Sequence, residues 1–373
     1  MSGLTDVCRS CLGRTWLLGH LSGLLDASRR RLFELLALPD ADLVAALAPR
    51  ARAQTLDALA CFCESGVDGV DAERARAAAA GLRLVCRCSD AYPSCVRALD
   101  APPAVLHIAG SVKAWERTCR GEDSASHVAV VGARRCSAYG REVARSLGRG
   151  LAHAGLGVVS GLALGVDSAA HAGALDGDGF AVAVLPVAGR RGYPASARGL
   201  HERIVGSGVV VSELGPGIVP RPWTFLARNR LIAALAAMTV VVEGSERSGS
   251  LVTARIADGL GRRVGAVPGE VTRPQAAGSN GLLADGRTFV RDVQDIVDAL
   301  LGKGAPRLAL EERRPVPTDA QSATLRAVAE GANTIERLAE RGDALDAAVA
   351  NLAALELAGW VRRGPGGRFI VIP

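Results

Sequence analysis

Short apolar runs alternate with segments of helical periodicity through the middle of the chain. The apolar runs lack the polar–apolar alternation of a half-exposed strand, which is typical of parallel strands buried on both faces. The predicted strands are 128–132, 157–161, 180–186, 208–214, 239–244 and 263–269, and the predicted helices are 139–154, 168–175, 197–206, 227–237 and 251–259. The pattern therefore predicts an α/β fold with a parallel-sheet core.

The two ends of the chain carry different patterns. Leucines at helical spacing predict a small helical module near the N-terminus, and a segment rich in Gly, Pro and mixed charges predicts a linker after the core. The last segment predicts three helices and a hairpin with a Gly-Pro-Gly-Gly turn, which is the order of a winged helix. We expect a helical (SAM or helix-hairpin-helix-like) module at 1–83, a pre-core extension at 84–126, the core at 127–300, a linker at 301–317 and a winged-helix domain at 318–373.

Composition narrows the class of protein. A chain of 373 residues is long enough for two or three domains, and its apolar runs are too short or too interrupted to span a membrane. Arg9 and Arg14 interrupt any N-terminal apolar stretch, so we expect no signal peptide and a cytoplasmic location. The net charge is +6, most of the excess lies in the predicted core, and Lys113 and Lys303 are the only lysines. Arginine binds phosphate through paired donors, so an excess of positive charge that is almost entirely arginine favours an anionic partner.

The nine cysteines all lie between Cys8 and Cys136. The close pairs are Cys8/Cys11, Cys61/Cys63 and Cys86/Cys88, of which the first alone has the spacing of a zinc knuckle. No second CxxC or HxxxH follows. We expect small buried apolar thiols, with no metal and no cofactor, and a zinc site is the alternative.

Glycine, serine and arginine stand where the predicted strands end. Ligands of open parallel sheets bind outside the carboxyl ends of the strands, and the N–H groups at the start of the following helix can hold phosphate. The charges around the fifth strand lie at element ends, at Arg228, Arg230, Glu243, Arg247 and Arg255. We expect a phosphate-binding edge there.

Three other polar residues have ordinary structural interpretations. Asp167 is expected to cap a helix, with a catalytic role as the alternative, and His171 is expected to be a half-buried histidine one turn further on. Glu243 is expected to hydrogen-bond a loop or an arginine.

Several motifs of known chemistry are missing from the sequence. There is no GxxxxGK[ST], which argues against a P-loop ATPase, and no GxGxxG followed by a ribose-binding acid. HExxH and GxSxG are also missing, so zincin and α/β-hydrolase chemistry have no support.

Five segments together resemble the DNA-processing protein A family (DprA, also called Smf). They are VAVVGARRCSAYG, VVSGLALGVDSAAHAGAL, FLARNRLIAAL, EGSERSGSLVTA and VGAVPGEVTRPQAAGSNGLLADG, and SDAYPSCVRALDAPPAVLHIAG resembles the segment before the family's core. The resemblance implies an extended Rossmann-like core that binds single-stranded DNA and passes it to the RecA recombinase in natural transformation or other recombination. It also implies a homodimer through that core and a binding role without catalysis, and the apolar runs predict no membrane association.

The resemblance also places candidate DNA-binding residues. We expect phosphate contacts at positions that match the family's signature, with Asn229 ordering its neighbouring arginines. The loop after the third strand departs from the family, since Pro186 replaces a glycine there, and two arginines in that loop are expected to add phosphate contacts. The candidates are Gly132, Arg134, Ser160, Gly161, Arg190, Arg191, Arg228, Asn229, Arg230, Ser248, Gly249, Ser250 and Thr253.

Base stacking has few candidates because aromatic residues make up only 3% of the chain. Tyr193, Trp223 and Phe225 could stack on bases or could simply pack in the protein. The predicted last helix, 344–358, has no basic residue, which favours contact with a protein or with duplex backbone over base recognition.

A second interpretation is a nucleotide sensor or a phosphoribohydrolase-like enzyme of the same Rossmann type. Such enzymes resemble this chain in fold, but use a PGGxGT loop with a nearby glutamate. Here SGSLVT occupies that place and lacks the pattern.

Overall fold

A computed structural model of the chain describes residues 7–51, 68–120, 127–189, 195–302, 317–341 and 344–372. The chain divides into two compact units, Met1–Leu308 and Ala309–Pro373, which are described separately. None of the helices in the described segments is long and apolar enough to cross a membrane.

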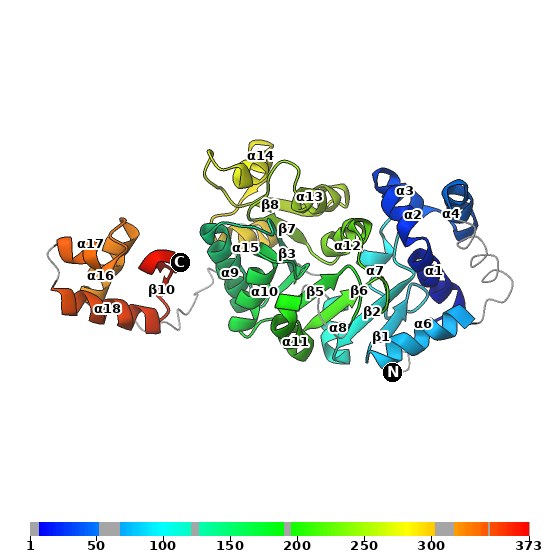
Figure 1. The fold of residues 1–373 in the computed structure, drawn as a ribbon, viewed down its shortest axis with the longest axis horizontal. Coiled ribbons are helices and arrows are strands. Elements are labelled where there is room, and N and C mark those ends of the chain that lie inside the picture. The colour runs from blue at the N-terminus through cyan, green and yellow to red at the C-terminus, as the bar shows by residue number, and fades with distance from the viewer. Residues whose placement is uncertain are drawn as a thin grey trace. The chain divides into compact units, whose positions relative to one another are not determined.

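A nine-stranded sheet runs through the first unit (Figure 1). Its order is β1-β2-β6-β5-β4-β3-β7-β8-β9, and the strands from β6 to β9 in this order pair in parallel. At one edge β2 pairs antiparallel with β6, and β1 pairs antiparallel with β2. The strands are β1 (Arg83–Cys86), β2 (Val105–Gly110), β3 (His127–Val131), β4 (Gly157–Ser160), β5 (Ala181–Leu185), β6 (Val209–Ser212), β7 (Met238–Val241), β8 (Arg263–Ala266) and β9 (Thr288–Phe289).

Helices cover both faces of this sheet, as the unbroken apolar strands predict. Val128 and Val130 of β3 pack in one apolar cluster, whereas Ala129 and Val131 pack in another on the opposite face. The helices are α7 (Ser94–Arg97), α8 (Val112–Arg120), α9 (Ala138–His153), α10 (Val166–Asp176), η3 (Ala195–Ala197), α11 (Arg198–Ser207), α12 (Pro222–Ala234), α13 (Gly249–Gly259), η4 (Pro274–Ala276), α14 (Ala277–Ala284) and α15 (Val293–Leu301).

One predicted helix boundary is wrong in a way that matters for the site. The helix predicted to begin at residue 227 begins at Pro222, which occupies its first turn. Proline is favoured at the first helical position because that N–H needs no intrahelical acceptor. The additional residues bring Phe225 and Leu226 onto α12.

The N-terminal helices pack against the β2 edge and against α12. Their leucines share an apolar cluster with Leu214, Trp223 and Ala227. Trp223 is fully buried there and donates from Nε1 to Ser22 Oγ at 2.9 Å, so it packs in the protein and does not stack on bases. These elements are α1 (Arg9–His20), α2 (Ser22–Ala27), η1 (Arg29–Arg31), α3 (Leu32–Ala37), α4 (Asp40–Leu47), η2 (Ala48–Arg50) and α6 (Asp68–Ala79).

The second unit contains three helices and a hairpin, in the predicted order. Thr318 opens the first helix with a capping box, in which its side chain and that of Gln321 each accept the other's backbone N–H. The elements are α16 (Asp319–Ala329), α17 (Ile335–Glu340), α18 (Leu345–Leu357), β10 (Val361–Arg363), η5 (Pro365–Gly367) and β11 (Phe369–Val371). The winged-helix assignment of this unit stays a prediction.

Two glycines allow α9 and α10 to pack closely. A Cβ added at Gly148 would lie 2.1 Å from the carbonyl oxygen of Ala170, and one added at Gly173 would lie 2.0 Å from that of Arg145. We predict that Gly148→Ala lowers the free energy of unfolding by about 1–3 kcal/mol, because the helices must separate.

The matched control is Gly206→Ala in α11, where an added Cβ meets no atom within 4 Å. It should be neutral or stabilise by up to about 1 kcal/mol through helix propensity. Urea unfolding of both variants compares them, and equal effects at the two positions would refute the close-packing account.

Candidate functional site

A cleft opens at the point in the sheet where the chain changes the side on which it adds strands. From β3 the chain adds β4, β5 and β6 on one side, and then returns to place β7 on the other side of β3. Such reversal points form crevices at the carboxyl ends of parallel strands. The cleft has a volume of about 620 Å³ and is lined by residues that follow β3, β4 and β7, by α12 with the two residues before it, and by Arg29 of the N-terminal helices.

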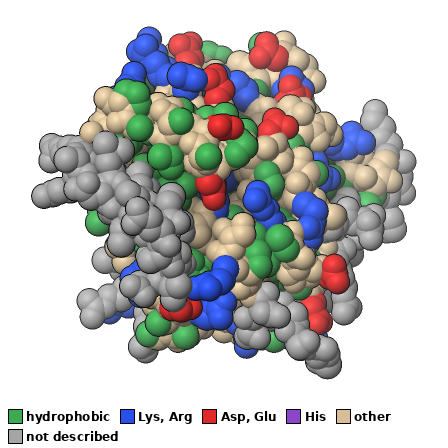
Figure 2. Space-filling model, turned by 90° about the vertical axis from the view of Figure 1, so that its right-hand side faces the viewer, with side chains coloured by type: hydrophobic (Ala, Val, Ile, Leu, Met, Phe, Trp, Pro, Cys, Tyr) green, Lys and Arg blue, Asp and Glu red, His purple; other side chains and the backbone are tan. Residues whose placement is uncertain are grey.

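Positive charge dominates this cleft. Its lining includes Arg29, Arg134, Arg221 and Arg228, against Asp167 as the one acidic side chain among its described lining residues. Arg29, Arg134 and Arg221 are exposed. The face in Figure 2 carries Lys and Arg side chains in separate groups interspersed with Asp and Glu. The cleft is therefore a place where arginines from distant parts of the chain converge.

Arg134 stacks on an aromatic ring at the mouth of the cleft. Its guanidinium carbon lies 5.0 Å from the ring centroid of Phe225, which is half-buried. A cation–π contact attracts a guanidinium to the face of the ring, and a guanidinium carries five N–H donors. The contact holds Arg134 at the mouth of the cleft, and its N–H groups can bind an anion there.

The start of α13 contributes backbone donors. Ser248 is its N-cap and accepts from the Ser250 N–H at 3.2 Å, and the two hydroxyls lie 2.7 Å apart. Gly249 is exposed and has open space around its Cα, so a ligand can approach the backbone closely. Helix N-termini attract anions through their unpaired N–H groups and the helix dipole.

Arg228 lies buried beside these groups. Its Nη1 donates to the carbonyl oxygens of Gly161 and Val184, both at 2.6 Å, and its Nε donates to Asn229 Oδ1 at 3.2 Å. Burial lowers the pKa of Arg228 to about 10, and the nearby carboxylate of Asp167 opposes that shift. Arg228 is therefore still charged at neutral pH.

Gly161 is required by this arrangement. A Cβ at Gly161 would lie 1.8 Å from Nη1 of Arg228, so no other residue leaves room for the guanidinium. Next to it, Leu162 is a buried leucine with a φ of 52°, a left-handed conformation that is costly for its residue type. Such backbone strain is often found at functional sites.

Comparisons with known proteins identify the family of this chain. The family model described as DNA recombination-mediator protein A matches residues 83–301. The chain belongs to that family.

Relatives and solved structures extend the comparison. A DNA processing protein DprA of Mycobacterium tuberculosis is 45% identical over 238 residues, which are 62% of this chain and 61% of that protein. Protein Smf of Escherichia coli is 33% identical over 291 residues, covering 75% of each. This chain thus spans about three fifths of the mycobacterial relative's length.

Two solved structures of the family share the fold. That of DNA processing protein A from Streptococcus pneumoniae is 29% identical with a TM-score of 0.61, covering 79% of this chain and 99% of that one. That of the Helicobacter pylori protein, described by its single-stranded DNA binding mode, is 29% identical with a TM-score of 0.50. The match covers 56% of this chain and 93% of that one. The cleft residues from β3 to α13 lie inside the matched region, whereas Arg29 lies outside it.

Most of the predicted site residues of the family's core converge on the cleft. Those that line it are Gly132, Arg134, Arg228, Asn229, Ser248, Gly249, Ser250 and Thr253. Gly161 does not line the cleft, but its carbonyl accepts from Arg228. Ser160 is buried, and its hydroxyl donates to the Val130 carbonyl at 2.6 Å. Arg190, Arg191 and Tyr193 lie outside the described residues.

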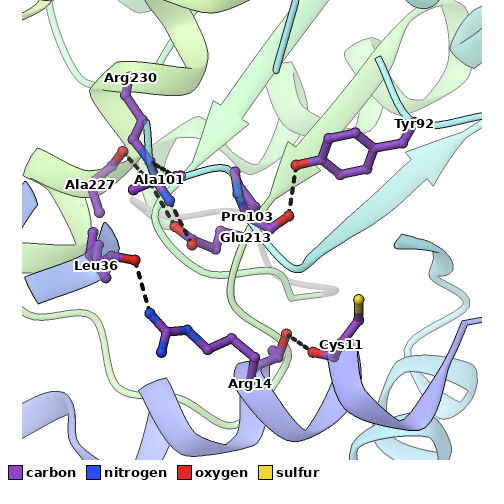
Figure 3. Close-up of polar contacts among 10 residues, drawn as sticks. Cys11, Arg14, Leu36, Tyr92, Ala101, Pro103, Glu213, Ala227 and Arg230 are labelled. Carbon is purple, nitrogen blue, oxygen red and sulfur yellow. Dashed lines mark hydrogen bonds and ion pairs between the residues drawn. The ribbon is translucent and has the colours of Figure 1, made fainter. Parts of the chain in front are cut away.

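Arg230 does not line the cleft, and the expectation that it contacts phosphate does not fit its placement. It is 3% exposed and forms a two-pronged ion pair with Glu213, at 2.7 and 2.9 Å (Figure 3). It also donates to the carbonyls of Ala101 and Ala227. On α12, positions 228 and 230 point to different sides, so Arg228 reaches the cleft while Arg230 joins the helix to the β2 side of the unit.

Three further expectations meet different outcomes. Glu243 binds a loop as predicted, since its carboxylate accepts from the Ser137 N–H at 2.8 Å. Asp167 does not cap α10: it lies inside the first turn and accepts from the Gly161 N–H at 3.1 Å, and burial raises its pKa while Arg228 opposes the shift. His171 is fully buried, not half-buried, and burial lowers its pKa to about 4.

Two cleft arginines escaped the sequence analysis. Arg29 belongs to the N-terminal helices, and Arg221 immediately precedes α12. The Arg-Pro pair at 221–222, next to an aromatic-rich helix start, was the available signal for Arg221, whereas the position of Arg29 depends on tertiary packing.

The different placements of two arginines predict different effects on stability. Arg230→Ala leaves the buried carboxylate of Glu213 without its cation, and should lower the free energy of unfolding by about 3–5 kcal/mol. Arg134→Ala removes an exposed side chain, and should change it by less than about 0.5 kcal/mol. Urea unfolding measures both, and an unaffected Arg230→Ala variant would contradict the buried ion pair.

Proposed function

We propose that this chain binds single-stranded DNA by its phosphates, along the cleft between α12 and α13. The observation that carries the proposal is the convergence of Arg29, Arg134 and Arg221 with the N-terminus of α13 in one open crevice. Membership of the family and the single-stranded DNA binding named for the Helicobacter pylori relative support it.

The arrangement suits a polymer better than a small ligand. Binding without sequence preference needs a positive groove that follows the backbone, together with modest stacking. The exposed arginines come from three separate segments of the chain, so a series of phosphates can engage them in turn. Phe225 supplies an aromatic surface, although it already holds Arg134.

We further propose a role as a recombination mediator. The bound strand would be protected and passed to RecA during natural transformation or other recombination, with the protein acting as a homodimer through its core in the cytoplasm. The C-terminal unit would serve as a winged-helix accessory domain. These steps rest on the family, and the cleft supplies the DNA-binding part.

The competing interpretation is an enzyme or sensor for a nucleotide. Asp167 is the sole acidic side chain among the described lining residues, and it already serves the Gly161 N–H and faces Arg228. The phosphoribohydrolase-like enzymes considered above use a glutamate near their loop, and an acid–base catalyst must be able to reach the substrate. Release of free base from nucleoside monophosphates, without a gel shift of a dT oligomer, would favour the enzyme over the DNA-binding protein.

Arg134→Ala tests the proposed function directly. Loss of a charge-assisted phosphate contact should cost about 1.5–3 kcal/mol, which is tenfold or more in affinity for a dT oligomer. Fluorescence anisotropy over a series of salt concentrations gives the slope of log affinity against log salt concentration. This slope should be about −2 if three phosphates are neutralised, and Arg134→Ala should lower the magnitude of the slope by about 0.7.

The matched control is Arg263→Ala, which removes the same charge at the exposed amino end of β8, the opposite edge of the sheet. Its affinity and salt slope should stay close to those of the unchanged protein. A flat salt slope, or equal losses in the two variants, would refute the arginine-lined cleft as the DNA site.

A further inference from the structure

Four cysteine thiols meet at one point on the N-terminal side of the first unit. The Sγ atoms of Cys8, Cys11, Cys86 and Cys88 all lie within 4.8 Å of one another. The Sγ atom of Cys88 is 3.9 Å from that of Cys8 and 3.7 Å from that of Cys11. Cysteines that are 75 residues apart in sequence have no reason to converge in this way through packing alone.

The sulfur spacing matches a tetrahedral metal site. Zinc–thiolate bonds are about 2.3 Å long, so the sulfurs of a regular tetrahedron lie about 3.8 Å apart. We propose that Cys8, Cys11, Cys86 and Cys88 form a structural zinc site with four thiolate ligands.

The backbone presents the four side chains in two pairs. Cys8 is the N-cap of α1 and Cys11 lies in its first turn, so residues three apart face the same side of the helix. Cys86 ends β1, and the Ser89 N–H donates to its carbonyl at 2.9 Å, which turns the chain and brings Cys88 back toward Cys86. One helix start and one strand end thus supply two ligands each.

The surroundings suit a bound ion. Cys11 and Cys86 are 1% and 2% exposed within an apolar cluster, whereas Cys8 and Cys88 are exposed and open a route for the metal. On binding, the four thiols release their protons, and the site carries a net charge of −2. Arg9 and Arg87 flank the ligands in sequence, and Arg74 donates to the Val7 carbonyl at 3.0 Å beside them, so positive charge lies nearby.

Two simpler interpretations fit less well. Buried apolar thiols, as expected from the sequence, do not describe Cys8 and Cys88, which are both exposed. A disulfide joins two sulfurs at about 2.05 Å, whereas the Sγ atom of Cys88 lies at similar, non-bonded distances of 3.9 and 3.7 Å from those of Cys8 and Cys11. Iron also takes four thiolates, and the experiment below distinguishes it from zinc.

A zinc ion here would fasten the N-terminal helices to the sheet. It would link α1 to β1 and close a long loop of chain, which restricts the unfolded state as well as holding the folded one. The same helices carry Arg29, so the ion would also stabilise one wall of the cleft.

The test is elemental analysis of the full-length protein, purified under reducing conditions without a metal-affinity column. We expect about one zinc ion per chain, lost in Cys8→Ser/Cys88→Ser, which alters only the exposed ligands. The control Cys136→Ser, outside the cluster, should retain it. Circular dichroism confirms that each variant is folded, and cobalt added to chelator-stripped wild-type protein should give the absorption of a tetrahedral thiolate complex.

Several results would overturn the proposal. They are iron in place of zinc, zinc retained by the double variant, a disulfide among these cysteines in freshly prepared protein, and failure of the reduced wild-type protein to bind added zinc or cobalt. The cobalt titration needs no substitution, so it decides the question even if the double variant does not fold. The readouts are independent of DNA binding, so this proposal and the proposed function can fail separately.

Discussion

The buried guanidinium of Arg228 is the constraint on which the functional edge of the sheet depends. A buried charge must find acceptors, and Arg228 finds them in the carbonyls that follow β4 and end β5, with Asp167 as its counter-charge. These contacts position α12 over the strand ends, and Asn229 extends them to the Gly249 carbonyl at the start of α13 at 3.3 Å. The walls of the cleft are thus fixed from inside the protein, and its exposed arginines come from other segments of the chain.

Local and periodic features of the fold could be predicted from sequence, because they depend on neighbouring residues. Unbroken apolar strands and intervening helices predicted a sheet buried on both faces, and glycines at strand ends marked the carboxyl edge. The assignment of individual arginines was less accurate. Arg228 and Arg230 are two residues apart on one helix, but one lines the cleft and the other pairs with Glu213. Their difference depends on which neighbours each side of the helix meets, and a motif does not contain that information.

Contacts between distant segments were the least predictable. Arg29 reaches the cleft because the N-terminal leucines pack against α12, and Cys8 and Cys11 reach Cys86 and Cys88 because α1 lies beside β1. The contact of Arg29 leaves no spacing signature in the sequence, and the zinc-knuckle spacing of Cys8/Cys11 does not indicate that its partner pair lies 75 residues further on. Both connect the N-terminal helices to the family's core.

The most direct measurement is a crystal structure of the chain with a dT oligomer. The account predicts successive phosphates along the cleft, with one within hydrogen-bond distance of the Arg134 guanidinium and another at the N-terminus of α13, and with Arg230 still paired with Glu213. An oligomer bound elsewhere on the surface, with the cleft empty, would contradict it.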